Sequence, residues 1–354
     1  MKKLLPILLA LLVLPACTNG QIGENKTLAT TSNIENKISN KLNISDIFPF
    51  KNNIKLKYAS SSGDSSTSYL YVDYLVNDRM QFRMVNSDTS TGYVIENKNG
   101  ELRLIASRDK FFYHDDLTNY QNENPEIIIK EPLVKGTSWL LPNGKKRYIS
   151  KDNVQISTAS GKYISLEVTT ETDTGKIIDY YAPNIGLVEK IIYVSNSKTM
   201  IYLEAISENE ASNDTVKFYY NDLKDNVTNY YQRQLPFKTN DNLKTYFEKY
   251  LKEVPNEKFT ALISKNTKIN ALHTDINTKT VYMDFSKDFI NDTKLDLNSE
   301  KLVLQSITNT ICDYYTMDKL LLTIEGNPYK SVNISLKPNE PMYKTDTKYA
   351  GEYK

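Results

Sequence analysis

The stretch Thr280-Val281-Tyr282-Met283-Asp284-Phe285-Ser286-Lys287-Asp288-Phe289 decides how the second half of this 354-residue chain is expected to fold. Apolar side chains occupy every second position from Val281 to Phe285, which predicts a β-strand with one buried face. Tyr282 and Asp284 fall on the other face. Ser286 favours a sharp turn directly after the strand. We therefore expect the neighbouring elements to pack around this strand.

The segments on either side of this strand predict an α+β domain over residues 214–336. Amphipathic helices are expected at 241–252, capped by Asn240 or Asp241, and at 299–315, because apolar residues recur there every three or four positions. The order ββ-α-ββ-α-ββ predicts one sheet with both helices on one face. Its strands are expected at 216–220, 230–235, 268–273, 280–285, 320–325 and 332–336.

Residues 46–206 form a succession of short alternating runs that are separated by turn residues such as Asn99-Gly100. Hairpin turns at this spacing predict an all-β domain, an antiparallel meander that forms a curved sheet or a half-barrel. The polar segment 207–213 is expected to be a linker between the two domains. Residues 337–354 are expected to be a C-terminal tail.

The first 45 residues predict export and attachment to a membrane. Two lysines precede an apolar run, Leu4–Leu14, that is shorter than the roughly 20 residues needed to span a bilayer. Leu14-Pro15-Ala16-Cys17 resembles the bacterial lipobox, which implies that residues 1–16 are a signal peptide and that Cys17 carries a lipid. The alternative is a plain signal peptide. Residues 17–45 are rich in polar residues and are expected to be a flexible tether.

Charge and cysteine content limit the classes of function. The chain has 44 basic and 43 acidic residues, and loss of Lys2 and Lys3 with the signal peptide leaves 42 basic ones. A net charge so close to zero argues against nucleic acid as a partner. Cys17 and Cys312 are the two cysteines. If Cys17 is lipidated, no disulfide can form within the chain, and the folded domains must depend on their cores.

The second domain resembles the GerMN domain of sporulation and spore germination proteins. The loop before Lys268 lacks the Gly-Pro that is usual in that family, and one copy is present where some relatives have two. The resemblance implies an extracytoplasmic, non-enzymatic domain of spore-forming bacteria that takes part in envelope assemblies. Its fold would be related to modules that build rings. The matching segments are Val216–Tyr220, Arg233, the helix at Leu243, Lys268-Ile269, Val281–Phe289, Ser306–Ile311 and Leu322–Pro328.

The residues themselves predict no catalytic or metal site. Asp284 and Asp288 are carboxylates near one strand end, but nothing in the sequence raises the pKa of either one. We expect Asp284 to form hydrogen bonds with the turn after the strand, and Asp288 to cap the segment that follows this turn. No nucleophile has a base within its own segment, and no spaced histidines or cysteines predict a metal. We therefore expect a protein that is not an enzyme and that needs no cofactor.

These observations favour a lipid-anchored protein on the extracytoplasmic face of the cell membrane, which acts by protein binding in sporulation or germination. We expect an envelope protein partner, or weak self-association, through whichever of the apolar strands 216–220 and 320–325 lies at a sheet edge. The expected binding residues are Tyr219, Tyr282 and Asp284. In tyrosine pairs such as Tyr219-Tyr220, one ring is expected to pack and the other to be exposed. One alternative is a carrier of a lipid or other hydrophobic ligand in the first domain, and a cell-wall hydrolase is a third hypothesis.

Overall fold

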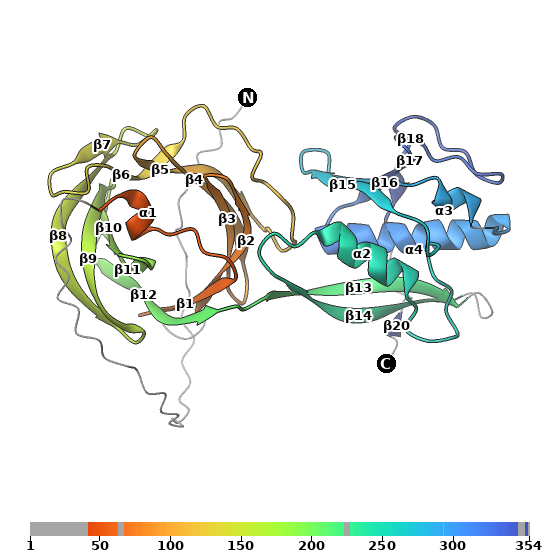
Figure 1. Ribbon diagram of the computed structural model, residues 1–354, viewed down its shortest axis with the longest axis horizontal. Helices are drawn as coiled ribbons and strands as arrows, with labels where there is room; N and C mark the ends of the chain where they lie inside the picture. Colours follow the sequence, from red (N-terminus) through yellow and green to blue (C-terminus); the bar gives the residue numbers. More distant parts are fainter. Residues whose placement is uncertain (1–41, 63–66, 223–226, 293, 346–350, 353–354) are drawn as a thin grey trace, which may run out of the picture. The chain divides into compact units, whose positions relative to one another are not determined.

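The computed structural model describes residues 42–62, 67–222, 227–292, 294–345 and 351–352 (Figure 1). The predicted signal peptide 1–16, the lipidation site Cys17 and most of the predicted tether lie outside these residues. The chain divides into two compact units. The first takes most of the chain before Ser212 together with Lys238–Asn240, and the second takes Phe112–Asp115, Ser212–Phe237 and the chain from Asp241 onward.

The first unit is a strongly curved antiparallel sheet whose strands form a nearly closed ring (Figure 1). This confirms the predicted all-β fold. Asn99 and Gly100 both have positive φ, 55° and 70°, which makes the tight turn of one hairpin. The strand order is β6-β5-β4-β3-β2-β1-β12-β11-β10-β9-β8-β7. The strands are β1 (Ile54–Ser60), β2 (Ser68–Val76), β3 (Arg79–Val85), β4 (Ser90–Lys98), β5 (Glu101–Asp109), β6 (Glu126–Lys130), β7 (Ser138–Leu140), β8 (Lys146–Thr158), β9 (Gly161–Glu171), β10 (Gly175–Ala182), β11 (Gly186–Val194) and β12 (Ser197–Glu208).

Side chains join the two ends of this sheet, β6 and β7. The indole Nε1 of Trp139 in β7 donates to the carbonyl of Ile127 in β6 at 2.9 Å. Arg147 in β8 donates to the same carbonyl at 2.8 Å and pairs with Glu126 at 2.9 Å. Both donors are buried, with 6% of Trp139 and 4% of Arg147 exposed. These bonds form the seam that closes the ring.

A short helix, α1 (Ile44–Ile47), lies inside the ring of strands (Figure 1). Asn43 caps it by accepting from the backbone N–H of Asp46, and the Asp46 carboxylate accepts from the Asn43 N–H in return. Ile44 and Ile47 are buried in the core of the first unit. The predicted tether 17–45 therefore extends too far. Its last residues are part of the fold, because this apolar pair needs burial.

The second unit has two sheets, with α2 (Leu243–Lys252) and α4 (Leu297–Tyr315) between them (Figure 1). The sheet that contains the strand predicted at 280–285, which is β16, has the order β15-β16-β17-β18. β19 also pairs with β17, and β16 runs parallel to β17. A short helix, α3 (Asp288–Asn291), follows β16. The strands are β13 (Ser212–Asp222), β14 (Val227–Phe237), β15 (Ile269–Asp275), β16 (Thr280–Phe285), β17 (Lys319–Ile324), β18 (Asn327–Pro328), β19 (Met342–Tyr343) and β20 (Gly351–Glu352).

The predicted α+β class is confirmed, but the prediction of a single sheet is wrong. β13, β14 and β20 form a separate sheet. The reason lies in the edge of β13, where Thr310 of α4 accepts from the Tyr219 N–H at 3.0 Å and Asn221 donates to the Ser306 hydroxyl at 2.6 Å. These bonds turn the β13 edge toward the helix and away from the other sheet.

Several predicted boundaries also differ from the structure. Residues 332–336 form no strand. On the side away from β16, β17 pairs instead with β18 and with β19, and β19 lies in the predicted tail. Helix α2 is capped by Asn242, and α4 begins at Leu297 with Asp296 as its cap. Within the predicted linker, only residues 209–211 lie between strands β12 and β13.

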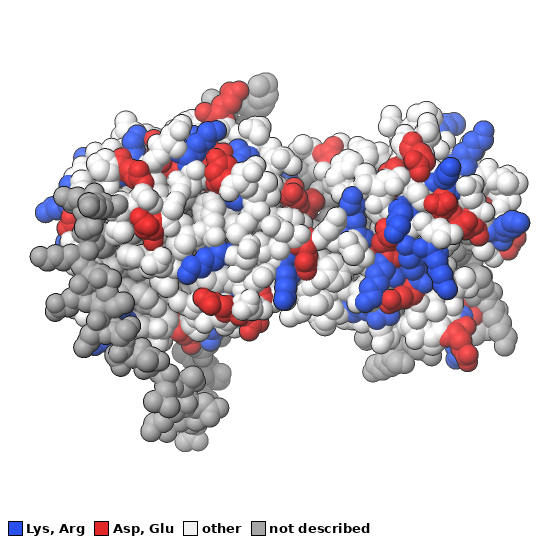
Figure 2. Space-filling model, viewed as in Figure 1, with Lys and Arg blue, Asp and Glu red and all other residues white. Residues whose placement is uncertain are grey.

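The surface seen in Figure 2 carries acidic and basic side chains interspersed on both units. Neither sign forms a large uniform field on this face, which agrees with a net charge near zero. In the part of the chain that the structure describes, no helix combines the length and the apolarity needed to cross a membrane.

Replacing Arg147 by Met is expected to lower the free energy of unfolding of the first unit. The change removes the bond to Ile127 and leaves Glu126 without its buried partner, a loss of roughly 2–4 kcal/mol in the free energy of unfolding. Denaturant unfolding would measure it. Lys145→Met is the matched control, because its partner Asp173 is 81% exposed and an exposed pair contributes roughly 0–1 kcal/mol. Equal losses in the two variants would show that the seam does not hold the ring closed.

Candidate functional site

The strands of the first unit line a cavity of about 190 Å³ that is partly open to solvent. Alternation along each strand sends every second side chain inward, so the strands β1 to β5 contribute an almost wholly apolar wall. Residues of this wall are Leu56, Leu70, Val72, Met80, Phe82, Met84, Ile95 and Leu104.

The strands that face this apolar wall contribute charged side chains to the same cavity. Glu126 and Arg147 form one ion pair, and Asp179 of β10 and Lys190 of β11 form another. Each charge is therefore compensated by its neighbour, as a buried charge requires. Burial, and then the charge of Asp179, raise the pKa of Tyr181 well above its ordinary value, so its hydroxyl stays protonated. The wall is polar but carries no net charge.

The segment that follows α1 forms part of the cavity lining through Phe48, Pro49 and Lys51. The turn between β10 and β11 holds it, because the Asn184 N–H donates to the Asp46 carbonyl at 2.7 Å. Lys51 donates to the Asn184 carbonyl at 3.0 Å. Gly186 in this turn has φ +93°, and a Cβ there would lie 3.1 Å from the Phe48 ring. The turn and the segment are thus fitted closely to each other.

In the second unit, Asp284 near the end of β16 stabilises the end of the neighbouring strand β17. Its Oδ1 accepts from the Thr323 hydroxyl at 2.5 Å and from the Gly326 N–H at 2.8 Å, and its Oδ2 accepts from Asn270 at 2.9 Å. Asp284 therefore bonds the turn after β17. Asp288 accepts from the Ser286 hydroxyl at 3.1 Å in the first turn of α3. Both carboxylates have structural partners.

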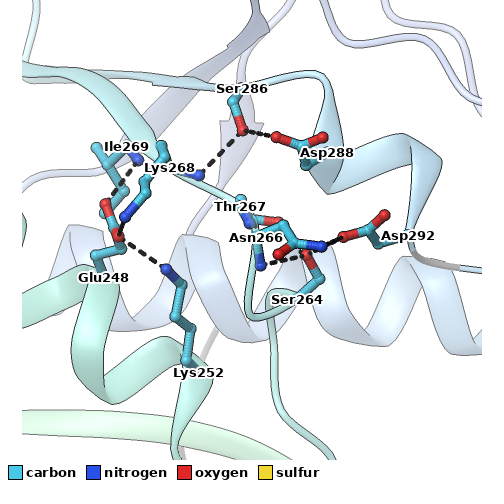
Figure 3. A network of polar contacts seen from close by, with 10 residues as sticks. All are labelled: Glu248, Lys252, Ser264, Asn266, Thr267, Lys268, Ile269, Ser286, Asp288 and Asp292. Atoms are coloured by element: carbon cyan, nitrogen blue, oxygen red, sulfur yellow. Dashed lines mark hydrogen bonds and ion pairs between the residues drawn. The ribbon is translucent and has the colours of Figure 1, made fainter.

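A polar network joins α2 to the beginning of β15 (Figure 3). Glu248 accepts from Lys252 at 2.8 Å, from Lys268 at 2.9 Å and from the Ile269 N–H at 3.2 Å. Burial raises the pKa of Glu248, but these hydrogen bonds outweigh it and hold the pKa below the ordinary value of 4.5.

In the same view, Asp292 accepts from Ser264 and Asn266 at 2.8 and 2.9 Å (Figure 3). These contacts fix the loop before β15 to the residue that follows α3. Within the described residues, no group of three or more His, Cys, Asp and Glu side chains is placed to hold a metal ion.

The predicted binding residue Tyr219 cannot contact a partner, because it is only 1% exposed. Its neighbour Tyr220 is buried as well and donates to the Tyr250 carbonyl at 2.8 Å. The expectation that one ring of each pair is exposed is therefore wrong here, since both faces of β13 are covered. Tyr282 is half-buried, and its ring stacks on the exposed His273 with centroids 4.8 Å apart.

The accessible sheet edge also differs from the prediction. Strand β17 lies inside its sheet, and α4 covers the edge of β13. β15 is the outer strand beside β16. Side chains of α2 form hydrogen bonds with the backbone of the first residues of β15: Glu248 accepts from the Ile269 N–H, and Lys244 donates to the Asn270 carbonyl. The edge that remains is Ala271–Asp275, within which the Thr274 hydroxyl donates to the Asp115 carboxylate at 2.9 Å. Pairing order, which single-strand patterns do not reveal, decides which strand lies outermost.

The second unit contains a match to a known family. Residues 217–330 match the Germane family, described as sporulation and spore germination. The first GerMN domain of the sporulation protein GerM from Bacillus subtilis is 24% identical over 36% of this chain and 93% of that one, with a TM-score of 0.28. The tandem GerMN domains of the same protein are 23% identical, with a TM-score of 0.28. This chain spans 45% of their length.

Another solved structure also matches part of the chain. An exported protein with a YmcC-like fold from Bacteroides fragilis is 13% identical over 46% of this chain and 99% of that one, with a TM-score of 0.30. No curated protein matches the sequence.

Replacing Glu248 by Gln is expected to make the second unit less dependent on pH. Because the pKa of Glu248 is lowered in the folded state, its contribution to stability is complete above 4.5 and is lost as the pH falls through the folded-state pKa. The variant should therefore be less stable than the unmodified protein at pH 7, and this difference should shrink at pH 3. Denaturant unfolding at both pH values measures it.

The exposed Glu257, changed to Gln, is the control for this measurement and should differ little from the unmodified protein at either pH. A Glu248→Gln deficit of the same size at pH 7 and pH 3 would contradict the assignment.

Proposed function

Since residues 217–330 form a Germane domain, we propose that this protein is a lipid-anchored accessory protein of the cell envelope that binds another protein in sporulation or spore germination. The domain match is the observation that carries this proposal. The anchor is Cys17, and the protein lies on the extracytoplasmic face of the membrane. The two units are held there by the lipid.

The lipid anchor is supported by Leu14–Cys17, which resembles the site of lipoprotein processing. Burial of acyl chains contributes about 0.8 kcal/mol for each CH₂, so two chains hold a protein stably where one chain holds it only marginally.

Action by binding, and not by catalysis, is supported by the partners of the candidate groups. Asp284 and Asp288 accept hydrogen bonds that stabilise a strand end and a short helix. Burial raises the pKa of the Cys312 thiol to about 12, so it remains protonated at neutral pH and is a poor nucleophile.

The proposed contact surface is the edge of β15 with the adjoining outer face of the sheet. Ala271–Asp275 pairs with β16 on one side, and its other side is the edge of the sheet. An outer strand offers backbone N–H and C=O groups to an added strand. The stacked rings of His273 and Tyr282 lie beside this edge and offer an amphipathic contact area. Tethering at a membrane raises the local concentration, so a weak contact is sufficient.

Cys17→Ser is expected to release the protein from the membrane fraction, because the proposed anchor is the lipid on Cys17. Labelling of cells with a radioactive fatty acid, followed by fractionation, measures both the modification and the retention. Cys312→Ser is the matched control and should keep label and retention, since Cys312 is buried. Undiminished membrane retention of Cys17→Ser would rule out the anchor.

A photo-crosslinking residue at position 273 or 282 is expected to capture one protein in sporulating cells, identified by mass spectrometry. Position 219, which is buried, and position 301, which is exposed on α4, are the controls and should capture nothing. A product of twice the chain mass would identify a second copy as the partner. Failure to crosslink at both 273 and 282 would contradict the proposed contact surface.

A further inference from the structure

The cavity of the first unit has the composition of a site for a molecule that is apolar along its length and charged at one end. One wall, from β1 to β5, is apolar, and the lining includes Phe48 and Pro49. A closed cavity of about 150 Å³ with a wholly apolar lining stays dry and accepts a small hydrocarbon. The cavity of the first unit measures about 190 Å³ and shares this property along one wall. That wall favours contact with hydrocarbon over contact with water.

The size of the cavity limits the ligand to one chain. Pockets for larger ligands measure about 300–1,000 Å³, well above the volume found here. Phe48 and Pro49 form part of the lining. A two-chain phospholipid is too large for this volume, whereas a single hydrocarbon chain suits the volume and the apolar wall.

The polar wall excludes the charged head of the ligand from the depth of the cavity. Arg147 and Glu126 neutralise each other, as do Lys190 and Asp179. A charged head placed there would have to separate a buried pair, which is costly. The two pairs are complete without a ligand charge.

Lys51 provides a positive charge that could pair with the charged head of a ligand. It lines the cavity and is half-buried, and its Nζ donates to the neutral Asn184 carbonyl. Among the described residues it forms no ion pair with a carboxylate. An ammonium group at the cavity that has no carboxylate partner favours an acidic ligand head, because a cation attracts an anion more strongly than it attracts a neutral carbonyl.

We propose that the cavity of the first unit binds the hydrocarbon chain of a single-chain amphiphile with an acidic head, and that Lys51 pairs with the head. The ligand has the chemistry of a fatty-acid carboxylate. The chain lies against the wall formed by β1 to β5, and the head lies at Lys51 beside the β10–β11 turn. This role goes beyond protein binding by the Germane domain and does not depend on it.

Calorimetric titration of the whole chain carrying Cys17→Ser tests the proposal, because this variant has no acyl group of its own to occupy the cavity. The probes are dodecanoate and dodecyltrimethylammonium, each kept below the concentration at which it forms micelles. They share one chain and differ in the sign of the head. We expect dodecanoate to bind with a stoichiometry of one and dodecyltrimethylammonium to bind at least ~10-fold more weakly.

Two variants locate the site. Lys51→Met keeps the apolar stem and removes the charge, so it should weaken dodecanoate binding about 10-fold and abolish the preference between the probes. Lys98→Met, at an exposed lysine outside the cavity, is the matched control and should leave the Kd unchanged. Met84→Trp places a larger ring in the lumen and should abolish binding of both probes.

If Met84→Trp unfolds, Ile201→Phe fills the lumen from β12 and takes its place. Three outcomes would overturn the proposal: absence of dodecanoate binding, an unchanged Kd in Lys51→Met, or full binding by folded variants with a filled lumen. The last would show that the probe binds on the surface.

Discussion

The structure of the first unit depends on the bonds that join the two ends of its sheet. Strands β6 and β7 are the last members of a long antiparallel order. The Ile127 carbonyl accepts hydrogen bonds from both Trp139 and Arg147, and Arg147 also forms an ion pair with Glu126. An open sheet would expose two strand edges and its apolar concave face to water. The seam joins these two edges instead, and the strands then surround the cavity.

The same arginine connects the seam to the cavity. Arg147 lines the lumen while it holds β6, so its charge must be compensated within the wall. Glu126 supplies that compensation, and Lys190 and Asp179 repeat the arrangement in the neighbouring strands. The wall can then be polar without attracting a counter-ion. Lys51, which comes from the segment after α1 and not from a strand, is the cation left for an acidic ligand.

The sequence predicts local structure well where one pattern decides it. Alternation around Val281–Phe285 locates β16, and the Asn99-Gly100 pair locates a hairpin turn. It does not predict which strands lie outermost, because this depends on pairing between distant segments. The burial of Tyr219 follows from hydrogen bonds between the edge of β13 and α4, which no strand pattern encodes. The role of Lys51 likewise depends on a contact with Asn184, far away in the sequence.

Native mass spectrometry of the protein released gently from cell membranes tests the central claim, that the closed ring of the first unit holds a ligand. We expect each molecule to carry one additional non-covalent mass in the range of a single-chain acid, beyond the mass of the covalent lipid. Collisional activation should release this mass without breaking the chain. A protein that leaves the membrane with its covalent lipid alone would contradict the claim.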